Sequence, residues 1–155
     1  EQSSAEIIDQ ATDRPITGPG DTFIAGGGAF GQKGLAYLDA NGHSPLYVVA
    51  DATNLLLVRR AGAVTLVNAQ VASLTDSHDY FAFYVATEPQ SGTLVLAAFG
   101  LWGQGTTAAA WYWQNVVAPD LAAYDKAYYV YEWTDGDDDA TPGPGDTFAP
   151  ISSGP

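Results

Sequence analysis

The stretch YFAFYVAT-EPQSG-TLVLAAF, residues 80–99, carries the clearest fold signal in the chain. Aromatic and β-branched residues dominate residues 80–87 and 93–99, and such runs are typical of strands. The five residues between them include Pro89 and Gly92, which are typical of a turn. The stretch therefore predicts a β-hairpin.

The chain on either side of this hairpin has the same character. Asn41-Gly42 is the strongest short-range hairpin signal in the sequence, and residues 60–62 separate two further β-rich runs. One short helix is expected at residues 120–126. The additional predicted strands cover residues 35–39, 45–50, 55–59, 64–71, 108–117 and 127–133. Strands at this spacing predict a mostly β fold, a single-domain β-sandwich or barrel-like sheet.

Composition narrows the possible partners and surroundings. The 155 residues suffice for one domain, and 5 Lys+Arg against 18 Asp+Glu give a net charge of −13, which disfavours nucleic acid and anionic membranes. The chain has no Cys, and no apolar run approaches the roughly 18 residues of a membrane-spanning helix. It begins at Glu1-Gln2-Ser3 without Met, as a mature chain does once a leader is removed. We expect an extracellular or cell-surface protein, its signal peptide removed, that does not span a membrane.

The two ends of the chain contain the same six-residue sequence. GPGDTF occurs at residues 18–23 and again at 143–148. Three explanations are open: both ends form a turn that leads into a short strand, the chain is a piece of a longer protein with a period near 125 residues, or the composition is locally biased. The expected organisation is an extended N-terminal arm at residues 1–21, a β-rich domain at 22–134, and an acidic, Pro/Gly-rich C-terminal segment at 135–155.

Aromatic residues gather in one part of the chain. All four Trp and 14 of the 19 aromatic residues lie between Tyr80 and Trp133, and residues 111–113 and 128–131 are rich in adjacent rings. Neighbours on a strand point to opposite faces, so both faces of such strands would carry rings. These strands are therefore either covered on both sides or expose a contact surface.

Residues 26–31, GGGAFG, fit the glycine pattern of a dinucleotide-binding turn, and Asp51 follows twenty residues later as a candidate ribose acid. Gly34 and Asn41-Gly42 leave room for only a short helix, and no second βαβ unit follows. A flexible Gly-rich turn is the favoured interpretation, with a small dinucleotide-binding enzyme as the less favoured alternative.

Acidic residues cluster near the C-terminal end. Asp135, Asp137 and Asp139 alternate as in a calcium loop, with Asp146 at the twelfth position. Ala140 stands where an EF-hand needs Gly, which excludes that motif. The four aspartates remain candidate Ca²⁺ ligands, and a solvated acidic linker is the alternative. No other cofactor is expected.

No catalytic constellation stands out in the sequence. His43 follows the Asn-Gly pair, and His78 lies between Ser77 and Asp79, where adjacent residues cannot face one another as a triad. Nucleophile-elbow, P-loop lysine and zinc-protease motifs are absent. The sequence does not predict an enzyme.

The strand beginning GDTFI at residues 20–24 resembles the opening strand of some archaeal S-layer and sheath-type extracellular structural proteins, and the acidic, Lys-poor, Cys-free composition is similar to theirs. The chain differs from such glycoproteins in having no N-glycosylation sequon. The resemblance implies a β-rich structural subunit at the cell surface, with no catalytic residues.

Two functions of different class follow from these observations. The favoured hypothesis is an extracellular structural subunit whose copies assemble into a filament, sheath or surface layer, with the polar N-terminal segment of one copy pairing as a strand with a sheet edge of the next. The alternative is a secreted carbohydrate-binding module that stacks sugars on Trp102, Trp111 or Trp113.

Overall fold

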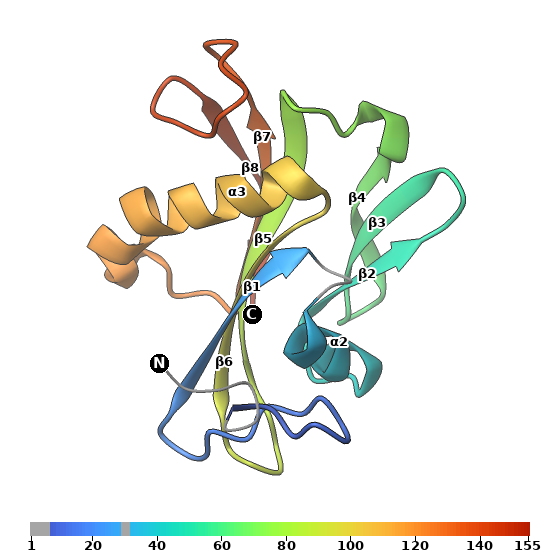
Figure 1. The fold of residues 1–155 in the computed structure, drawn as a ribbon, viewed down its shortest axis with the longest axis vertical. Coiled ribbons are helices and arrows are strands. Elements are labelled where there is room, and N and C mark those ends of the chain that lie inside the picture. Colours follow the sequence, from blue (N-terminus) through green and yellow to red (C-terminus); the bar gives the residue numbers. More distant parts are fainter. Residues whose placement is uncertain (1–6, 29–31) are drawn as a thin grey trace.

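A computed structural model describes residues 7–28 and 32–155. It has three layers, with a five-stranded sheet in the middle (Figure 1). A helical layer lies on one face of this sheet, and a short helix with a separate three-stranded sheet lies on the other. Strands make up 41% of the described residues and helices 23%, which confirms the mostly β single domain, although neither sheet closes into a barrel.

The central sheet has the strand order β1-β6-β5-β7-β8. Only β1 and β6 run parallel; the other neighbours are antiparallel. Its strands are β1 (Thr22–Gly28), β5 (His78–Thr87), β6 (Leu94–Gly100), β7 (Tyr128–Thr134) and β8 (Thr147–Gly154). The predicted hairpin at residues 80–99 is confirmed as β5 and β6, which occupy the centre of the sheet.

The smaller sheet has the order β2-β3-β4. Its strands are β2 (Leu46–Ala50), β3 (Asn54–Arg59) and β4 (Val64–Gln70), close to three of the predicted ranges. A 3-10 turn, η1 (Val71–Ser73), follows β4 and leads toward β5.

The predicted strand at residues 35–39 is wrong, because these residues belong to helix α2 (Lys33–Ala40). Leu35 and Leu38 are both buried, and their i, i+3 spacing places them on one helical face. Gly42 has a φ of +74°, and its N–H donates to the carbonyl of Asp39. Asn41-Gly42 therefore ends helix α2. An Asn-Gly pair is suited both to the end of a helix and to a hairpin turn.

The predicted strand at residues 108–117 is also wrong. It lies in a continuous helical layer composed of α3 (Gly103–Tyr112), the π-helical turn η2 (Trp113–Val117) and the 3-10 segment η3 (Ala118–Ala123). The helix predicted at residues 120–126 is represented only by the second half of η3. Ala108 and Ala109 are buried against the sheet, and the rings of Tyr112 and Trp113 pack on the same cluster, so this layer packs through small residues and aromatic rings together.

Two glycines set the distance between α3 and the sheet. A Cβ at Gly100 of β6 would lie 2.1 Å from the backbone N of Thr106, and a Cβ at Gly105 would lie 2.3 Å from the carbonyl O of Tyr80. The carboxylate of buried Asp79 accepts hydrogen bonds from the N–H groups of Trp102 and Gly105 at 3.2 and 2.5 Å. The first turn of α3 is thereby fixed to β5 and β6.

Both faces of the central sheet are covered where the aromatic residues lie. Phe81, Phe83 and Trp133 face the helical layer, whereas Tyr84 and Tyr128 face α2 and the smaller sheet. This arrangement confirms the first of the two interpretations for residues 128–131: β7 is a covered inner strand.

The expected extended arm, residues 1–21, packs on the domain over its described part, residues 7–21. Ile8 is buried in the main core and forms a bridge with Pro15. The Ser91 hydroxyl donates to the Pro15 carbonyl at 3.0 Å, and the Gly18 N–H donates to Thr93 Oγ1 at 2.9 Å. The β5–β6 turn therefore holds this segment against the domain. The segment is polar overall, but Ile8 packs in the core.

The C-terminal segment, residues 135–155, is also not wholly extended from the domain, since it contributes β8 to the sheet. Both copies of GPGDTF form a turn closed by the same hydrogen bond: Asp21 N–H donates to the Gly18 carbonyl, and Asp146 N–H donates to the Gly143 carbonyl. The glycine conformations differ, because Gly18 and Gly20 have positive φ and Gly143 and Gly145 do not. Each turn leads into an edge strand of the central sheet. The prediction that both copies form a turn followed by a short strand is confirmed.

Candidate functional site

The two edges of the central sheet differ in how they are protected. β8 contains Pro150, and Ile151 is an extra residue opposite β7, because Val130 pairs with Ser152 and Tyr131 with Pro150. A proline and a bulge are devices that prevent an edge strand from pairing with another chain. β8 is therefore a guarded edge.

β1 has neither device. Its seven residues, TFIAGGG, include no proline and no charged side chain. The Leu94 N–H donates to the Asp21 carbonyl at 3.1 Å, so Asp21 and Phe23 direct their backbone groups at β6, whereas Thr22 and Ile24 direct theirs outward. No other strand pairs with β1 within the described residues 7–28 and 32–155. β1 is an open edge.

The smaller sheet has a second open edge of the same length. β4, VTLVNAQ, has seven residues without proline or charge, and within the part of the chain that the structure describes it pairs only with β3. β1 and β4 belong to different sheets on one chain, and both present unpaired backbone groups.

An apolar strip lies beside the open edge of β1, on the sheet face that carries α3. Ile24 pairs with Leu96, and Leu96 pairs with Val85, so the strip crosses three strands. The helical layer crosses the other end of this face (Figure 1) and leaves Ile24 67% exposed. Exposed apolar residues in a contiguous strip mark a contact surface more often than isolated ones do.

An apolar groove of about 200 Å³ continues this strip beneath η2 and η3. Its main lining side chains are those of Phe83, Val85, Leu96, Trp113, Val117 and Leu121. Lys126 stands in the same wall, and its ammonium lies 3.0 Å from a carboxylate oxygen of Asp125. We call this feature the apolar groove.

The tryptophans proposed for sugar stacking do not form a shared platform. The Trp111 ring stacks on Phe148 at 5.1 Å, and the Trp113 ring packs against Phe83 at 5.8 Å. Trp102 is 51% exposed and stands at the other end of α3. Two of the three candidate rings therefore take part in packing under the helical layer.

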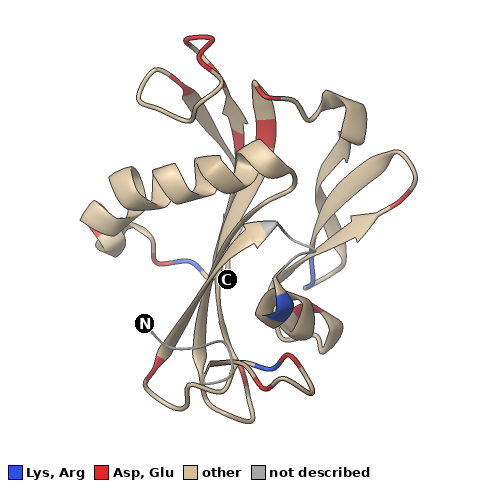
Figure 2. Cartoon of the chain, viewed as in Figure 1, with Lys and Arg blue, Asp and Glu red and all other residues tan. Residues whose placement is uncertain are grey.

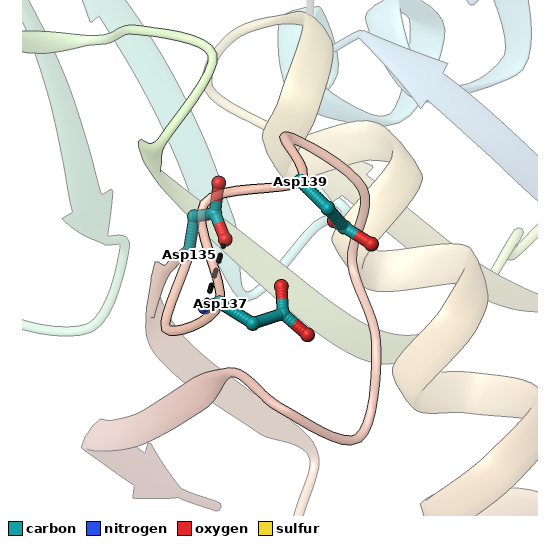
Figure 3. Close-up of side chains that lie close together, drawn as sticks. All are labelled: Asp135, Asp137 and Asp139. Atoms are coloured by element: carbon teal, nitrogen blue, oxygen red, sulfur yellow. Dashed lines mark hydrogen bonds between the residues drawn. The ribbon is translucent and has the colours of Figure 1, made fainter.

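The acidic residues lie in the loop between β7 and β8, and the structure brings three of the four together (Figure 3). Carboxylate oxygens of Asp135, Asp137 and Asp139 lie within 4.8 Å of one another. Partial desolvation and repulsion from Asp139, Asp146 and Asp135 raise the pKa of Asp137. Such a cluster could hold a cation of the Ca²⁺ type, which prefers carboxylate oxygens.

Asp146 lies outside this cluster and has a structural role. Its carboxylate accepts from the Trp133 indole N–H at 2.8 Å and from the backbone N–H groups of Gly136 and Gly143 at 2.9 and 2.8 Å. Asp135 is also engaged, since it accepts from the Ala140 N–H at 2.8 Å. These hydrogen bonds hold the loop in place through backbone and indole N–H groups.

His78 forms a contact that sequence spacing does not reveal. Its Nε2 lies 2.7 Å from a carboxylate oxygen of Glu132, and its Nδ1 lies 3.1 Å from the Ser73 carbonyl. Tyr80 OH donates to the same Glu132 oxygen at 3.3 Å. This cluster joins η1, β5 and β7. The Nε2 and Nδ1 hydrogen bonds of the His78 ring go to a carboxylate and a carbonyl, and neither partner is a hydroxyl nucleophile.

The glycine-rich motif does not build a dinucleotide site from the residues described. It lies partly in β1, residues 29–31 lie outside the described residues, and α2 has only eight residues. The strand that follows α2 belongs to the other sheet, so β1 and β2 do not form a parallel βαβ unit. Asp51 instead accepts from the N–H groups of Thr53 and Asn54 in the β2–β3 turn.

In comparisons with known proteins, no family model, curated protein or solved structure matches the chain. Within the described residues, every helix is too short or too polar to cross a membrane. The open edges and the apolar groove are therefore the features of the fold that bear on its function. Sequence reasoning missed the groove, although Leu94 and Leu96 alternate with Val95 and Ala97 and thus show that both faces of β6 are apolar.

Proposed function

We propose that the protein is an extracellular structural subunit that assembles with copies of itself into a filament, sheath or layer. The observation that carries this proposal is the asymmetry of the central sheet, with one guarded edge at β8 and one open edge at β1. A monomeric protein gains from protection at both edges. An edge left open is consistent with a strand of another chain pairing there.

The second open edge supports polymer growth rather than dimer formation. Pairing of β1 with β1 of a second copy would use one surface twice and would stop at a two-fold dimer. Pairing of β1 with β4 of a second copy uses two different surfaces of each chain, and such contacts continue into open assemblies. The two strands match in length, at seven residues each.

Charge supports the same choice of surfaces. Copies with a net charge of −13 repel one another, so contacts are favoured where the surface is uncharged. β1, β4 and the apolar strip carry no charged side chain. Apart from Asp21, which directly precedes β1, the acidic residues lie on other segments of the chain, mainly in loops and turns (Figure 2).

The test is electron microscopy of negatively stained protein combined with a blocked edge. Ile24→Pro removes an N–H that points away from β6, so the β1–β6 pairing persists while strand addition is blocked. Ile24→Val is the matched control, because it keeps the N–H and the β-branched shape. We expect wild type and Ile24→Val to form regular assemblies and Ile24→Pro to remain monomeric with an unchanged circular dichroism spectrum.

Two results would count against the proposal. A wild-type protein that stays monomeric at high concentration and moderate salt would refute self-assembly. Assemblies of Ile24→Pro that match those of the wild type would show that β1 is not the connecting edge.

A further inference from the structure

Trp102 is a large apolar side chain held out from the surface by a fixed backbone. It is 51% exposed, although its N–H is bound by the buried carboxylate of Asp79. Its carbonyl accepts hydrogen bonds from the N–H and the hydroxyl of Thr106, both at 3.3 Å. Exposed Trp side chains presented in this way are enriched among the residues that dominate protein interfaces.

The apolar groove has the size of one aromatic side chain. Its volume of about 200 Å³ exceeds the roughly 150 Å³ of an engineered cavity that binds benzene and falls below the roughly 300–1,000 Å³ of pockets for drug-sized ligands. An indole ring is larger than benzene and has no charge. The groove therefore suits an inserted side chain better than a whole cofactor.

One positive side chain lies at the groove, next to Asp125, and an acidic loop lies near Trp102. Lys126 stands in the wall of the groove and is the only Lys or Arg in the sequence after Arg60. The acidic loop adjoins the other end of the helical layer, where the Gln104 side chain donates to the Ala140 carbonyl at 3.1 Å. The ion pair of Lys126 with Asp125 is exposed and so contributes little, which leaves the ammonium able to exchange partners.

We propose that Trp102 of one copy inserts into the apolar groove of a second copy, with the acidic loop of the first copy next to Lys126 of the second. This inference rests on the proposed self-assembly and adds a side-chain contact to the strand pairing. Trp102 directly precedes α3 and the groove lies beneath η2 and η3, so the two features lie at opposite ends of the layer formed by α3, η2 and η3. Each copy would therefore donate a ring at one end and receive one at the other, and the contact propagates.

The chain lends itself to a cross-linking test because it has no cysteine. Gly103→Cys places a thiol beside Trp102, at a position where an added Cβ meets no atom within 4 Å. Leu121→Cys places a second thiol at the rim of the groove, where Leu121 is 58% exposed. Residues 103 and 117 already lie about 20 Å apart along the helical layer, given a rise of roughly 1.5 Å per residue. Position 121 follows at that far end in η3, so a short bismaleimide cannot join the two thiols within one chain.

We expect the double variant to give a ladder of covalent multimers and an equimolar mixture of the two single variants to give a one-to-one dimer. Trp102→Ala in the double variant should reduce the multimers at least tenfold, and Trp102→Phe should restore most of them. Gly103→Cys combined with Val49→Cys is the matched control, since Val49 is an exposed apolar residue on the smaller sheet. It should give no ladder.

The outcomes separate this contact from the proposed function. Regular wild-type assemblies without preferential cross-linking of the 103 and 121 positions would overturn the groove contact and leave strand pairing in place. The same conclusion would follow if a co-purified apolar molecule filled the groove and no cross-link formed between copies. A wild-type protein that does not assemble under any condition would remove the proposed function and this inference with it.

Discussion

Replacement of His78 by Gln should weaken the fold in a way that depends on pH. Both ring nitrogens of His78 face atoms that only accept hydrogen bonds, the Glu132 carboxylate and the Ser73 carbonyl. Only the doubly protonated ring can donate to both. Partial burial acts to lower the pKa of His78, but the hydrogen bonds to Glu132 and Ser73 together with the nearby negative charges of Glu132 and Asp79 raise it above its usual value.

The size of the effect follows from the geometry and exposure of the pair. A hydrogen bond to a charged group contributes about 1.5–3 kcal/mol. The Glu132 side chain is 38% exposed, and solvent screening reduces the contribution to about 1 kcal/mol. For a domain of this length, that free energy corresponds to a shift of roughly 2–4 °C in Tm.

The direction with pH follows from the raised pKa. The stabilisation is fully present below the unfolded-state value of about 6.5 and is lost as the pH rises through the higher folded-state value. Wild type and His78→Gln should therefore differ by the full amount at about pH 5.5 and by little at about pH 9. The comparison of two variants at each pH cancels the titration of carboxylates elsewhere in the chain.

Thermal unfolding followed by near-ultraviolet circular dichroism measures this difference. His43→Gln, at the other histidine in the sequence, is the matched control, because it removes an imidazole and leaves the contacts of His78 with Glu132 and Ser73 in place. An equal Tm shift at both pH values would mean that His78 contributes through packing alone. That result would refute the charged hydrogen-bond cluster.

Three further outcomes follow from the structure. Gly100→Ala should lower the free energy of unfolding in urea by about 3 kcal/mol or more, because its Cβ would lie 2.1 Å from the Thr106 N. Gly103→Ala adds a Cβ in open space and should be tolerated, and equal effects of the two substitutions would contradict the close packing of α3. Millimolar Ca²⁺ should raise Tm by relieving repulsion among the carboxylates of Asp135, Asp137 and Asp139. Identical melting curves with Ca²⁺ and with chelator would mean that hydrogen bonds alone hold the loop. Assembly measured by sedimentation should be stronger at 0.15 M than at 0.01 M salt, because the Debye length falls from about 30 to about 8 Å and the added salt screens repulsion between chains of net charge −13. Stronger assembly at low salt would mean that attraction between charges dominates the contact.

The sequence predicted the elements whose signal is local. The hairpin at residues 80–99 has strong β formers on both strands and turn residues between them, and it forms as expected. The two errors lie where short apolar runs fit either a helix or a strand. Residues 35–39 have a helical spacing of two leucines, and residues 108–117 combine Ala with rings that pack on one sheet face.

The candidate site was harder to predict because it depends on pairs far apart in the sequence. The acidic alternation at residues 135–139 was visible, and three of its carboxylates do lie together. The structural role that keeps Asp146 out of this cluster could not be foreseen, since it depends on the Trp133 indole N–H donating to its carboxylate. The apolar groove requires η3 to fold over β5 and β6, and that tertiary contact leaves no spacing signature.

The contact between Gly100 and Gly105 has a consequence for the entropy of association. Trp102 lies between these two glycines, at a point where backbone meets backbone without intervening side chains. A protein usually loses conformational freedom when a loop or side chain becomes ordered in a complex, and this loss weakens binding. At Trp102 the main chain is already ordered before any partner arrives, so only the side-chain torsions remain to be fixed. A weak contact formed there can therefore contribute more of its interaction energy to binding than the same contact formed by a free loop.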